Sequence, residues 1–174
     1  MPKNPAASRR IDGSVSLLVF DFDGVLTDNR VLVLEDGREA VLCNRADGLA
    51  FDMFRAAHIR VLIMSTERNP VVAARAAKLR VPVLQAVGDK GRALTERCRA
   101  DGLDLSRAVF VGNDLNDLPA MRLVGFPIAV ADAHPAVKRL AWTVLATRGG
   151  EGAAREVAEG ILGLRYDTTV HEGN

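Results

Sequence analysis

Short apolar runs recur along the chain and alternate with stretches that carry apolar residues at helical spacing. Continuous apolar runs of this length are typical of strands buried on both faces of a parallel sheet. They occupy residues 15–20, 59–65, 81–85, 107–112, 126–131 and 142–146. The helices predicted between and after them occupy residues 47–57, 70–79, 89–101, 116–124, 134–141 and 150–162. The alternation predicts an α/β fold, a doubly wound parallel sheet with helices on both faces.

One segment breaks the alternation. Residues 31–43 read "VLVLEDGREAVLC", in which Asp36-Gly37 separates two apolar-rich stretches. Asp-Gly in this setting is a strong β-hairpin signal. We expect a projecting hairpin whose apolar face stays exposed on a monomer; the alternative is that it folds back on its own domain. Candidate members of that face are Val31, Val33, Val41 and Cys43.

The length and composition are those of one globular domain. The chain has 174 residues, of which 48% are hydrophobic and 26% charged. We expect a single domain over residues 15–162, a flexible leader at 1–14 and a tail at 163–174. No apolar run approaches the ~20 residues that span a bilayer, and the leader lacks the apolar stretch of a secretory signal. These features predict a cytoplasmic protein.

Charge and cysteine content exclude several classes of function. The net charge is +1, from 23 basic and 22 acidic residues, so no long-range field favours nucleic acid or a membrane as partner. Cys43 and Cys98 lie far apart and form no pattern of zinc ligands. Any preference for an anionic substrate must therefore come from local placement of side chains.

Polar side chains follow the predicted strands at the points where these end. The carboxyl ends of parallel strands meet at one edge of a sheet, where ligands bind. Carboxylates gathered there bind a hard cation such as Mg²⁺, a lysine and a hydroxyl hold phosphate oxygens, and a carboxylate can attack phosphorus. Taken singly, each residue could be a helix cap, a turn or a solvated charge. The residues are Asp21, Asp23, Ser65, Thr66, Lys90, Asn113, Asp114 and Asp117.

Taken together, these residues resemble the four motifs of the haloacid dehalogenase superfamily of phosphatases. "DFDGVLTD" resembles the first motif, Ser65 the second, Lys90 the third and "GNDLND" the fourth, over residues 15–162. The resemblance implies a Rossmann-like haloacid dehalogenase fold with Mg²⁺ as cofactor. It implies that Asp21 is the nucleophile and Asp23 the general acid and base.

The resemblance also assigns the supporting residues. Ser65 and Lys90 would hold the phosphoryl group, and Asp117 would orient Lys90. Asp21 and Asp23 would bind the metal. Many members of the superfamily carry Asp directly after the glycine of the fourth motif, where this chain has Asn113. The third metal ligand is then Asp114 or the amide oxygen of Asn113; we favour Asp114, because an anion stabilises Mg²⁺ better than an amide.

Motif spacing indicates that the chain has no cap domain. The distances from Asp23 to Ser65 and from Ser65 to Lys90 leave room only for the hairpin and the helices of the sheet itself. Within the superfamily the chain resembles the capless group that acts on phosphorylated 3-deoxy-2-keto sugar acids. Members of that group are characteristically homotetramers in which each hairpin closes a neighbouring site, which we expect here.

The segment "STERNPVVAARAAKL", residues 65–79, resembles the branch acting on nine-carbon acids more than the eight-carbon branch. The substrate implied is 3-deoxy-nononate (KDN) 9-phosphate or an N-acylneuraminate 9-phosphate. By the same resemblance Glu67, Arg75 and Lys78 are substrate-binding residues, with Arg75 and Lys78 on one helix face. Arg45, Asp47 and Arg68 are weaker candidates.

Two other functions compete with this one. The first is hydrolysis of 3-deoxy-octulosonate (KDO) 8-phosphate, against which Glu67 argues, because the eight-carbon enzymes more typically read Thr-Gly-Arg near the second-motif serine. The second is a non-catalytic oligomerisation or regulatory module, related to domains fused to cytidylyltransferases. Asn113 supports that alternative. The complete set of competent groups favours catalysis.

Overall fold

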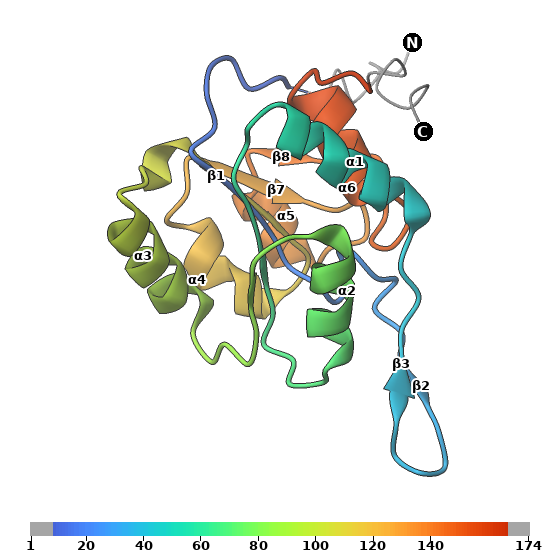
Figure 1. Ribbon diagram of the computed structural model, residues 1–174. Helices are drawn as coiled ribbons and strands as arrows, with labels where there is room; N and C mark the ends of the chain where they lie inside the picture. Colours follow the sequence, from blue (N-terminus) through green and yellow to red (C-terminus); the bar gives the residue numbers. More distant parts are fainter. Residues whose placement is uncertain (1–8, 167–174) are drawn as a thin grey trace.

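The computed structural model describes residues 9–166, which form a six-stranded parallel sheet covered by helices (Figure 1). The strand order is β5-β4-β1-β6-β7-β8. The bounds are β1 Leu17–Phe20, β4 Val61–Met64, β5 Val83–Leu84, β6 Ala108–Gly112, β7 Phe126–Ala129 and β8 Thr143–Val144. The predicted doubly wound parallel sheet is confirmed.

Two groups of helices cover the two faces of the sheet. α1 contacts α6, and right-handed crossovers place α2 on the same face as α1. On the other face α4 contacts both α3 and α5. The bounds are α1 Arg45–Ala56, α2 Val71–Leu79, α3 Lys90–Asp101, α4 Leu118–Met121, α5 Pro135–Leu140 and α6 Ala153–Glu156. No helix within residues 9–166 has the length and apolar character to cross a membrane.

Local sequence signals explain where the longer helices begin and end. The side chain of Asn69, which precedes the N-cap Pro70, accepts a hydrogen bond at 3.0 Å from the backbone N–H of Val71, the first residue of α2. The side chain of Asp89 accepts from Arg92 N–H in the same way at the start of α3. α3 ends at Gly102, whose φ of +63° is the left-handed conformation that glycine adopts without strain.

Two of the predicted helices, 116–124 and 150–162, differ from expectation. The predicted helix 116–124 is a 3₁₀ turn, Leu115–Asp117, followed by the single turn of α4. The predicted helix 150–162 begins at Ala153 and widens into a π-helix over Val157–Ile161. Side-chain capping decides the first case, because Asp114 and Asp117 form a capping box around the tight turn.

The core lies where α1 packs on the central strands. Leu18, Val19 and Phe20 of β1 are fully buried, as expected for a strand with helices on both faces. Phe20 packs on two phenylalanines of α1, with ring centroids 5.4 Å from Phe51 and 5.9 Å from Phe54. Burying each such ring stabilises the fold by roughly 1.5–3 kcal/mol. This packing holds β1, and therefore the aspartates that follow it, at a fixed place in the sheet.

Parts of the expected leader and tail are packed on the domain. Ile11 is buried in the core, and its N–H donates to the carbonyl of Ile161. Leu164 donates its N–H to Ala158 and packs against the core. Residues 9–14 are therefore not a loose leader, because an apolar side chain within a polar stretch anchors them. The expectations for residues 1–8 and 167–174 fall outside the described residues.

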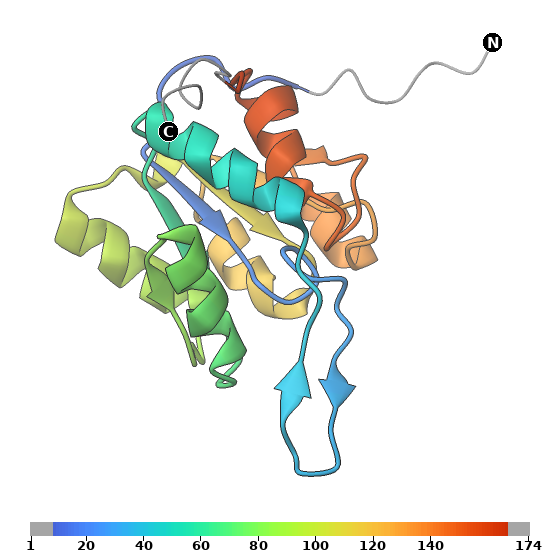
Figure 2. The ribbon, with the colours of Figure 1, turned by 45° about the vertical axis from the view of Figure 1, so that its right-hand side comes forward.

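The predicted hairpin projects from the sheet as a narrow arm (Figure 2). Its paired segments, β2 Leu32–Val33 and β3 Glu39–Ala40, are shorter than expected, and Gly37 takes a φ of +81° in the turn. Val41 and Cys43 pack partly against the core, so they are not part of the exposed apolar set. The exposed apolar side chains are Val31, Leu32, Val33, Leu34 and Leu42.

Candidate active site

The predicted polar side chains gather at the carboxyl edge of the sheet. Asp21 follows β1, Ser65 follows β4, Asn113 follows β6, and Lys90 begins α3. All four are buried, although side chains of these types are usually exposed. Burial of this kind requires partners, and those partners define the site.

Lys90 joins two carboxylates in the interior. Its ammonium nitrogen lies 2.6 Å from Oδ1 of Asp21 and 2.6 Å from Oδ1 of Asp117. An ammonium group has three N–H donors, so two are used here and one remains for a further acceptor. Asp117 also accepts backbone hydrogen bonds from Asn113 N–H at 2.8 Å and Asp114 N–H at 3.2 Å. Asp117 thereby connects the lysine to the end of β6.

Burial and charge act on the titration of this group in opposite directions. Burial raises the pKa of Asp21 to about 7, the nearby charge of Asp117 adds to the rise, and Lys90 opposes it. Burial by itself would lower the pKa of Lys90, but the charges of Asp21 and Asp117 outweigh it and raise that pKa. Lys90 therefore remains a cation, and Asp21 needs further positive charge to be fully ionised at neutral pH.

Asp23 lies two residues after Asp21 in the loop that follows β1, and it is half-buried. Its pKa is raised by burial first, then by the negative charge of Glu67 and of Glu39, while Lys90 lowers it. A carboxyl group with a raised pKa keeps its proton at a higher pH. This is the property that a general acid requires.

The loop after β4 leaves a hydroxyl proton free for a ligand. Ser65 Oγ accepts a hydrogen bond from the N–H of Glu67 at 3.0 Å, so its own proton can be donated elsewhere. The carboxylate of Glu67 turns back on the loop and accepts from the N–H groups of Arg68 and Asn69 at 2.6 and 3.0 Å. Both bonds use Oε1, and the second oxygen, Oε2, has no hydrogen-bond partner among residues 9–166.

Asn113 lies directly against the loop of aspartates. A Cβ atom at Gly24 would come within 2.0 Å of Asn113 Nδ2, and Gly24 has a φ of +80°, so only glycine fits there. The amide oxygen of Asn113 is buried and has no hydrogen-bond partner among residues 9–166. An unpaired buried oxygen is costly, so it indicates that a ligand completes the site.

Asp114 is placed differently from expectation. Its carboxylate accepts a hydrogen bond from Leu115 N–H at 2.7 Å and is exposed at the start of the 3₁₀ turn. In the part of the chain that the structure describes, no three His, Cys, Asp or Glu side chains form a group that could hold a metal ion. The expected ligand set of Asp21, Asp23 and Asp114 stays a prediction, and one oxygen of Asp114 is engaged in the cap of the 3₁₀ turn.

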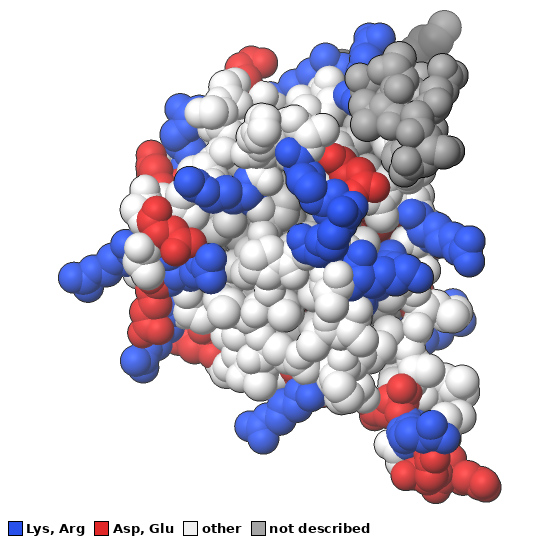
Figure 3. All heavy atoms as spheres, in the orientation of Figure 1, with Lys and Arg blue, Asp and Glu red and all other residues white. Residues whose placement is uncertain are grey.

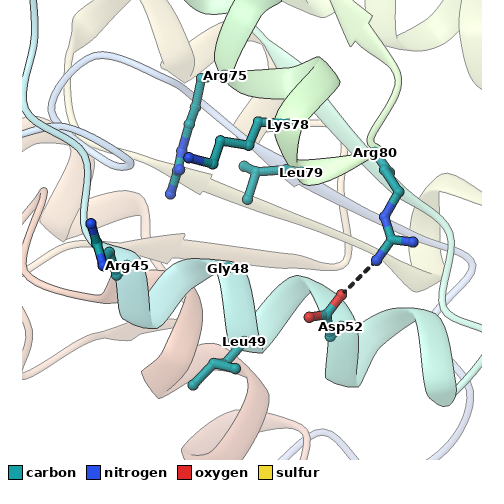
Figure 4. Close-up of a pocket in the computed structure, with 8 residues that line it drawn as sticks. All are labelled: Arg45, Gly48, Leu49, Asp52, Arg75, Lys78, Leu79 and Arg80. Atoms are coloured by element: carbon teal, nitrogen blue, oxygen red, sulfur yellow. Dashed lines mark hydrogen bonds and ion pairs between the residues drawn. The ribbon is translucent and has the colours of Figure 1, made fainter. Parts of the chain in front are cut away.

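Arg75 and Lys78 line a separate groove between α1 and α2, of about 410 Å³ (Figure 4). Arg45 faces them from the start of α1, and Arg80 pairs with Asp52 at 3.4 Å. Lys and Arg side chains gather over α1 and α2 on this face (Figure 3). None of the catalytic candidates lines the groove, so Arg75 and Lys78 do not share a pocket with Glu67.

Asp47 links two helices of the fold. It is buried in the first turn of α1 and accepts a hydrogen bond from Ala154 N–H at 3.0 Å, which ties α1 to the start of α6. Its other oxygen is buried without a partner among residues 9–166. Burial raises its pKa to about 6, against which the bond from Ala154 and the charge of Arg75 act more weakly.

We expect Asp47→Asn to change how stability depends on pH. A folded-state pKa raised from 3.8 to about 6 stabilises the fold below pH 4, and this contribution is lost as the pH rises through 6. Between pH 4 and pH 7 the free energy of unfolding of Asp47→Asn should therefore rise relative to that of the parent by up to about 3 kcal/mol. Urea unfolding at both pH values measures this. Asp52→Asn, a half-exposed carboxylate on the same helix, is the control, and parallel curves for parent and Asp47→Asn would contradict the assignment.

Two residues near the site were not predicted as functional. Glu39 reaches it from the hairpin, and the side chain of Asn69 donates a hydrogen bond to Glu39 at 2.8 Å. No local signal in the sequence marks Glu39, because its proximity to Asp23 depends on the direction in which the hairpin leaves the sheet.

Comparisons with known proteins agree with this arrangement. The family model for haloacid dehalogenase-like hydrolases matches residues 64–157. A curated relative, the 3-deoxy-D-manno-octulosonate 8-phosphate phosphatase of Haemophilus influenzae, is 31% identical over 161 residues, covering 91% of this chain and 89% of the relative.

Solved structures show the same fold. A HAD family hydrolase from Streptomyces avermitilis is 47% identical, covers 90% of each chain and has a TM-score of 0.86. The 3-deoxy-D-manno-octulosonate 8-phosphate phosphatase of Moraxella catarrhalis, in complex with magnesium, phosphate and KDO, is 30% identical with a TM-score of 0.80. The match covers 83% of this chain and 84% of the Moraxella chain. The chain belongs to the haloacid dehalogenase-like hydrolases.

Proposed function

We propose that this hydrolase is a Mg²⁺-dependent phosphatase of a phosphorylated 3-deoxy-2-keto sugar acid. The observation that carries the proposal is the buried contact of Lys90 with Asp21 and Asp117 at the carboxyl edge of the sheet. It puts the Asp21 carboxylate beside an ammonium group that has a proton to spare, and Ser65 follows a strand that ends at the same edge, which supports a joint role for the three residues. A phosphate monoester needs these groups, one to attack phosphorus and two to hold its oxygens.

The chemistry follows from the positions of the two aspartates. Asp21 attacks phosphorus and forms an aspartyl-phosphate as the P–O bond to the sugar breaks. Asp23 gives its proton to the departing alkoxide oxygen. Asp23 then takes a proton from water, whose oxygen attacks phosphorus, so that inorganic phosphate leaves and Asp21 is regenerated. Ser65 and Lys90 hold the phosphoryl oxygens throughout.

The donor set at this edge fits Mg²⁺. This ion prefers oxygen ligands, and the carboxylates of Asp21 and Asp23 supply them. For the third protein ligand the structure favours the amide oxygen of Asn113, which is buried without a partner, over Asp114, which is committed to a cap. When bound, Mg²⁺ supplies the positive charge that keeps Asp21 ionised and neutralises phosphate.

The substrate branch rests on Glu67. Its negative charge raises the pKa of Asp23, so the two carboxylates lie near each other, and carboxylates accept hydrogen bonds from sugar hydroxyls. We therefore propose a nine-carbon substrate, KDN 9-phosphate or an N-acylneuraminate 9-phosphate. KDO 8-phosphate is the second candidate, because curated relatives over most of this chain are phosphatases of that compound.

We propose that Arg75 and Lys78 bind the carboxylate of the sugar acid from a neighbouring subunit. They line a basic groove that the catalytic residues of their own chain do not enter. Arg offers the bidentate grip that suits a carboxylate. A homotetramer in which hairpins cover neighbouring sites would bring the two surfaces together, and it would also bury the exposed apolar residues of the hairpin.

A test of this assembly is the double variant Leu32→Ser/Leu42→Ser. Both side chains are exposed on the hairpin, so the monomer fold should not depend on them. We expect a smaller species in sedimentation velocity and a loss of sugar-acid phosphatase activity. Leu123→Ser, an exposed leucine beyond α4, is the matched control. An unchanged sedimentation profile of the double variant would exclude assembly through the hairpin.

The function itself is tested by phosphate release from KDN 9-phosphate, N-acetylneuraminate 9-phosphate and KDO 8-phosphate, each with Mg²⁺ and with EDTA. We expect release that depends on Mg²⁺ and a kcat/KM that is highest for a nine-carbon substrate. A preference for KDO 8-phosphate would select the second candidate. No release from any of the three by a folded tetramer would favour the non-catalytic module, and Asn113→Asp would then be the first reversion to assay.

A further inference from the structure

We propose that Asn69 is a positioning residue, which holds the hairpin and the carboxylate of Glu67 in a fixed relation and thereby sets substrate selectivity. The inference rests on the proposed function, because Glu67 is assigned there to the recognition of sugar hydroxyls. Neither Asn69 nor its partner Glu39 touches the phosphoryl-transfer residues in the bonds that they form.

The first part of the contact reaches the hairpin. Asn69 Nδ2 donates to Glu39 Oε2 at 2.8 Å, which joins the loop after β4 to strand β3 across 30 residues of sequence. At its root the two arms of the hairpin are joined by the antiparallel bridge between Thr27 and Cys43. A second contact further along the arm restricts the direction in which a two-stranded ribbon can swing, since such a ribbon has little stability alone.

The second part of the contact reaches Glu67. The N–H of Asn69 donates to Glu67 Oε1 at 3.0 Å. The remaining polar groups of Asn69 are also engaged: Oδ1 accepts from Val71 N–H at 3.0 Å, and the carbonyl oxygen accepts from Gln85 Nε2 at 2.7 Å. With every polar group bonded, this half-buried residue transmits a displacement of β3 to the loop that carries Glu67.

The charges explain why a neutral amide is used here. Within residues 9–166 no Lys, Arg or His nitrogen lies within 4.0 Å of a carboxylate oxygen of Glu39 or Glu67. Both carboxylates act on the pKa of Asp23, so both lie on its side of the site. A cation in place of Asn69 would neutralise them and attract phosphate to the wrong position. The neutral side chain of Asn69 holds Glu39 and its backbone N–H holds Glu67, which leaves the charge of both carboxylates available to accept hydroxyl protons.

The test exchanges the donor and the acceptor. Asn69→Asp places a carboxylate against Glu39 but retains an oxygen to cap Val71 N–H, so the helix is preserved. In Asn69→Asp/Glu39→Gln the amide introduced at position 39 can donate to the carboxylate introduced at position 69, which restores the contact with its direction reversed. Glu96→Gln, an exposed carboxylate on α3, is the matched control for loss of charge.

Three ester substrates and one physical measurement report the result. We compare KDN 9-phosphate with KDO 8-phosphate. For whichever of the two the parent prefers, we expect Asn69→Asp to raise KM about fivefold, which corresponds to the loss of one hydrogen bond, with little change in kcat. The loss of kcat/KM on p-nitrophenyl phosphate, which lacks the hydroxyl groups that Glu67 would bind, should be less than about twofold. Hydrogen exchange at residues 31–43 should accelerate. The exchanged pair should restore both KM and hydrogen exchange.

The outcomes separate this inference from the proposed function. If the parent protein hydrolyses none of the three esters, the proposed function fails. Unchanged hydrogen exchange at residues 31–43 in Asn69→Asp would overturn the positioning role of Asn69, whether or not the parent is active. If the parent is active, an equal loss on sugar-acid and small esters would overturn the inference. A double variant that remains as impaired as Asn69→Asp would do so too.

Discussion

Asp21→Asn should reduce phosphate release from every ester by at least about a thousandfold and leave the fold intact. The amide has no anionic oxygen with which to attack phosphorus, so no covalent intermediate can form. The fold should survive because Lys90 keeps its 2.6 Å contact with Asp117. The substitution also removes a carboxylate whose pKa is raised to about 7 by burial, which is a cost to the folded protein at neutral pH.

The measurement is phosphate release under saturating substrate, together with thermal unfolding of parent and variant. Asp28→Asn, in the same loop but bonded to the exposed Arg30, is the matched control and should retain activity. Retained turnover in Asp21→Asn would remove the nucleophile from our mechanism. A collapse of the unfolding temperature would instead mean that the residue is primarily structural.

Lys90→Met should remove activity and also destabilise the fold, by about 3–5 kcal/mol at pH 8. The methionine fills the space, but it leaves Asp21 and Asp117 buried together without the ammonium that pairs with both. Lys90 lowers the pKa of Asp21, so its removal raises that folded-state pKa further above the unfolded value. A raised pKa stabilises the fold only at low pH, and the contribution is lost as the pH rises.

The deficit should therefore be larger at pH 8 than at pH 5, where part of the carboxylate charge is taken up by protons. Urea unfolding of parent and Lys90→Met at both pH values measures it. Lys78→Met replaces an exposed lysine of α2 in the same way and should change stability little at either pH. Equal deficits at pH 5 and pH 8 would show that lost packing, rather than unpaired charge, is responsible.

The strands were predictable because the apolar pattern that marks them is local. "LLVF" is buried on both faces in β1, and the same holds for β6, so the positions of Asp21 and Asn113 at strand ends follow from the sequence. The topology rule for parallel sheets then brings these ends to one edge. The ends of the shorter helices were less predictable, since capping by Asp114 and Asp117 replaces most of the helix expected at 116–124.

Side-chain direction was the harder problem at the site. The sequence offered Asn113 and Asp114 as alternative ligands, and charge favoured Asp114. In the structure Asp114 caps Leu115 N–H, and it is the oxygen of Asn113 that is buried without a partner. Similarly, Arg75 and Lys78 share a helix face as expected, yet that face opens into a groove away from Ser65 and Lys90. Sequence spacing places residues on a face without stating what that face meets.

The parallel sheet, the hairpin and the residue types that meet at the carboxyl edge all follow from local patterns in the amino-acid sequence, because periodicity and strand order are properties of the chain. The tertiary structure decided which oxygens are free, that Asp47 ties α1 to α6, and that Glu39 approaches Asp23 through Asn69. These facts depend on distances between residues that are remote in sequence. Such distances are set by packing of the whole core, which no local pattern encodes.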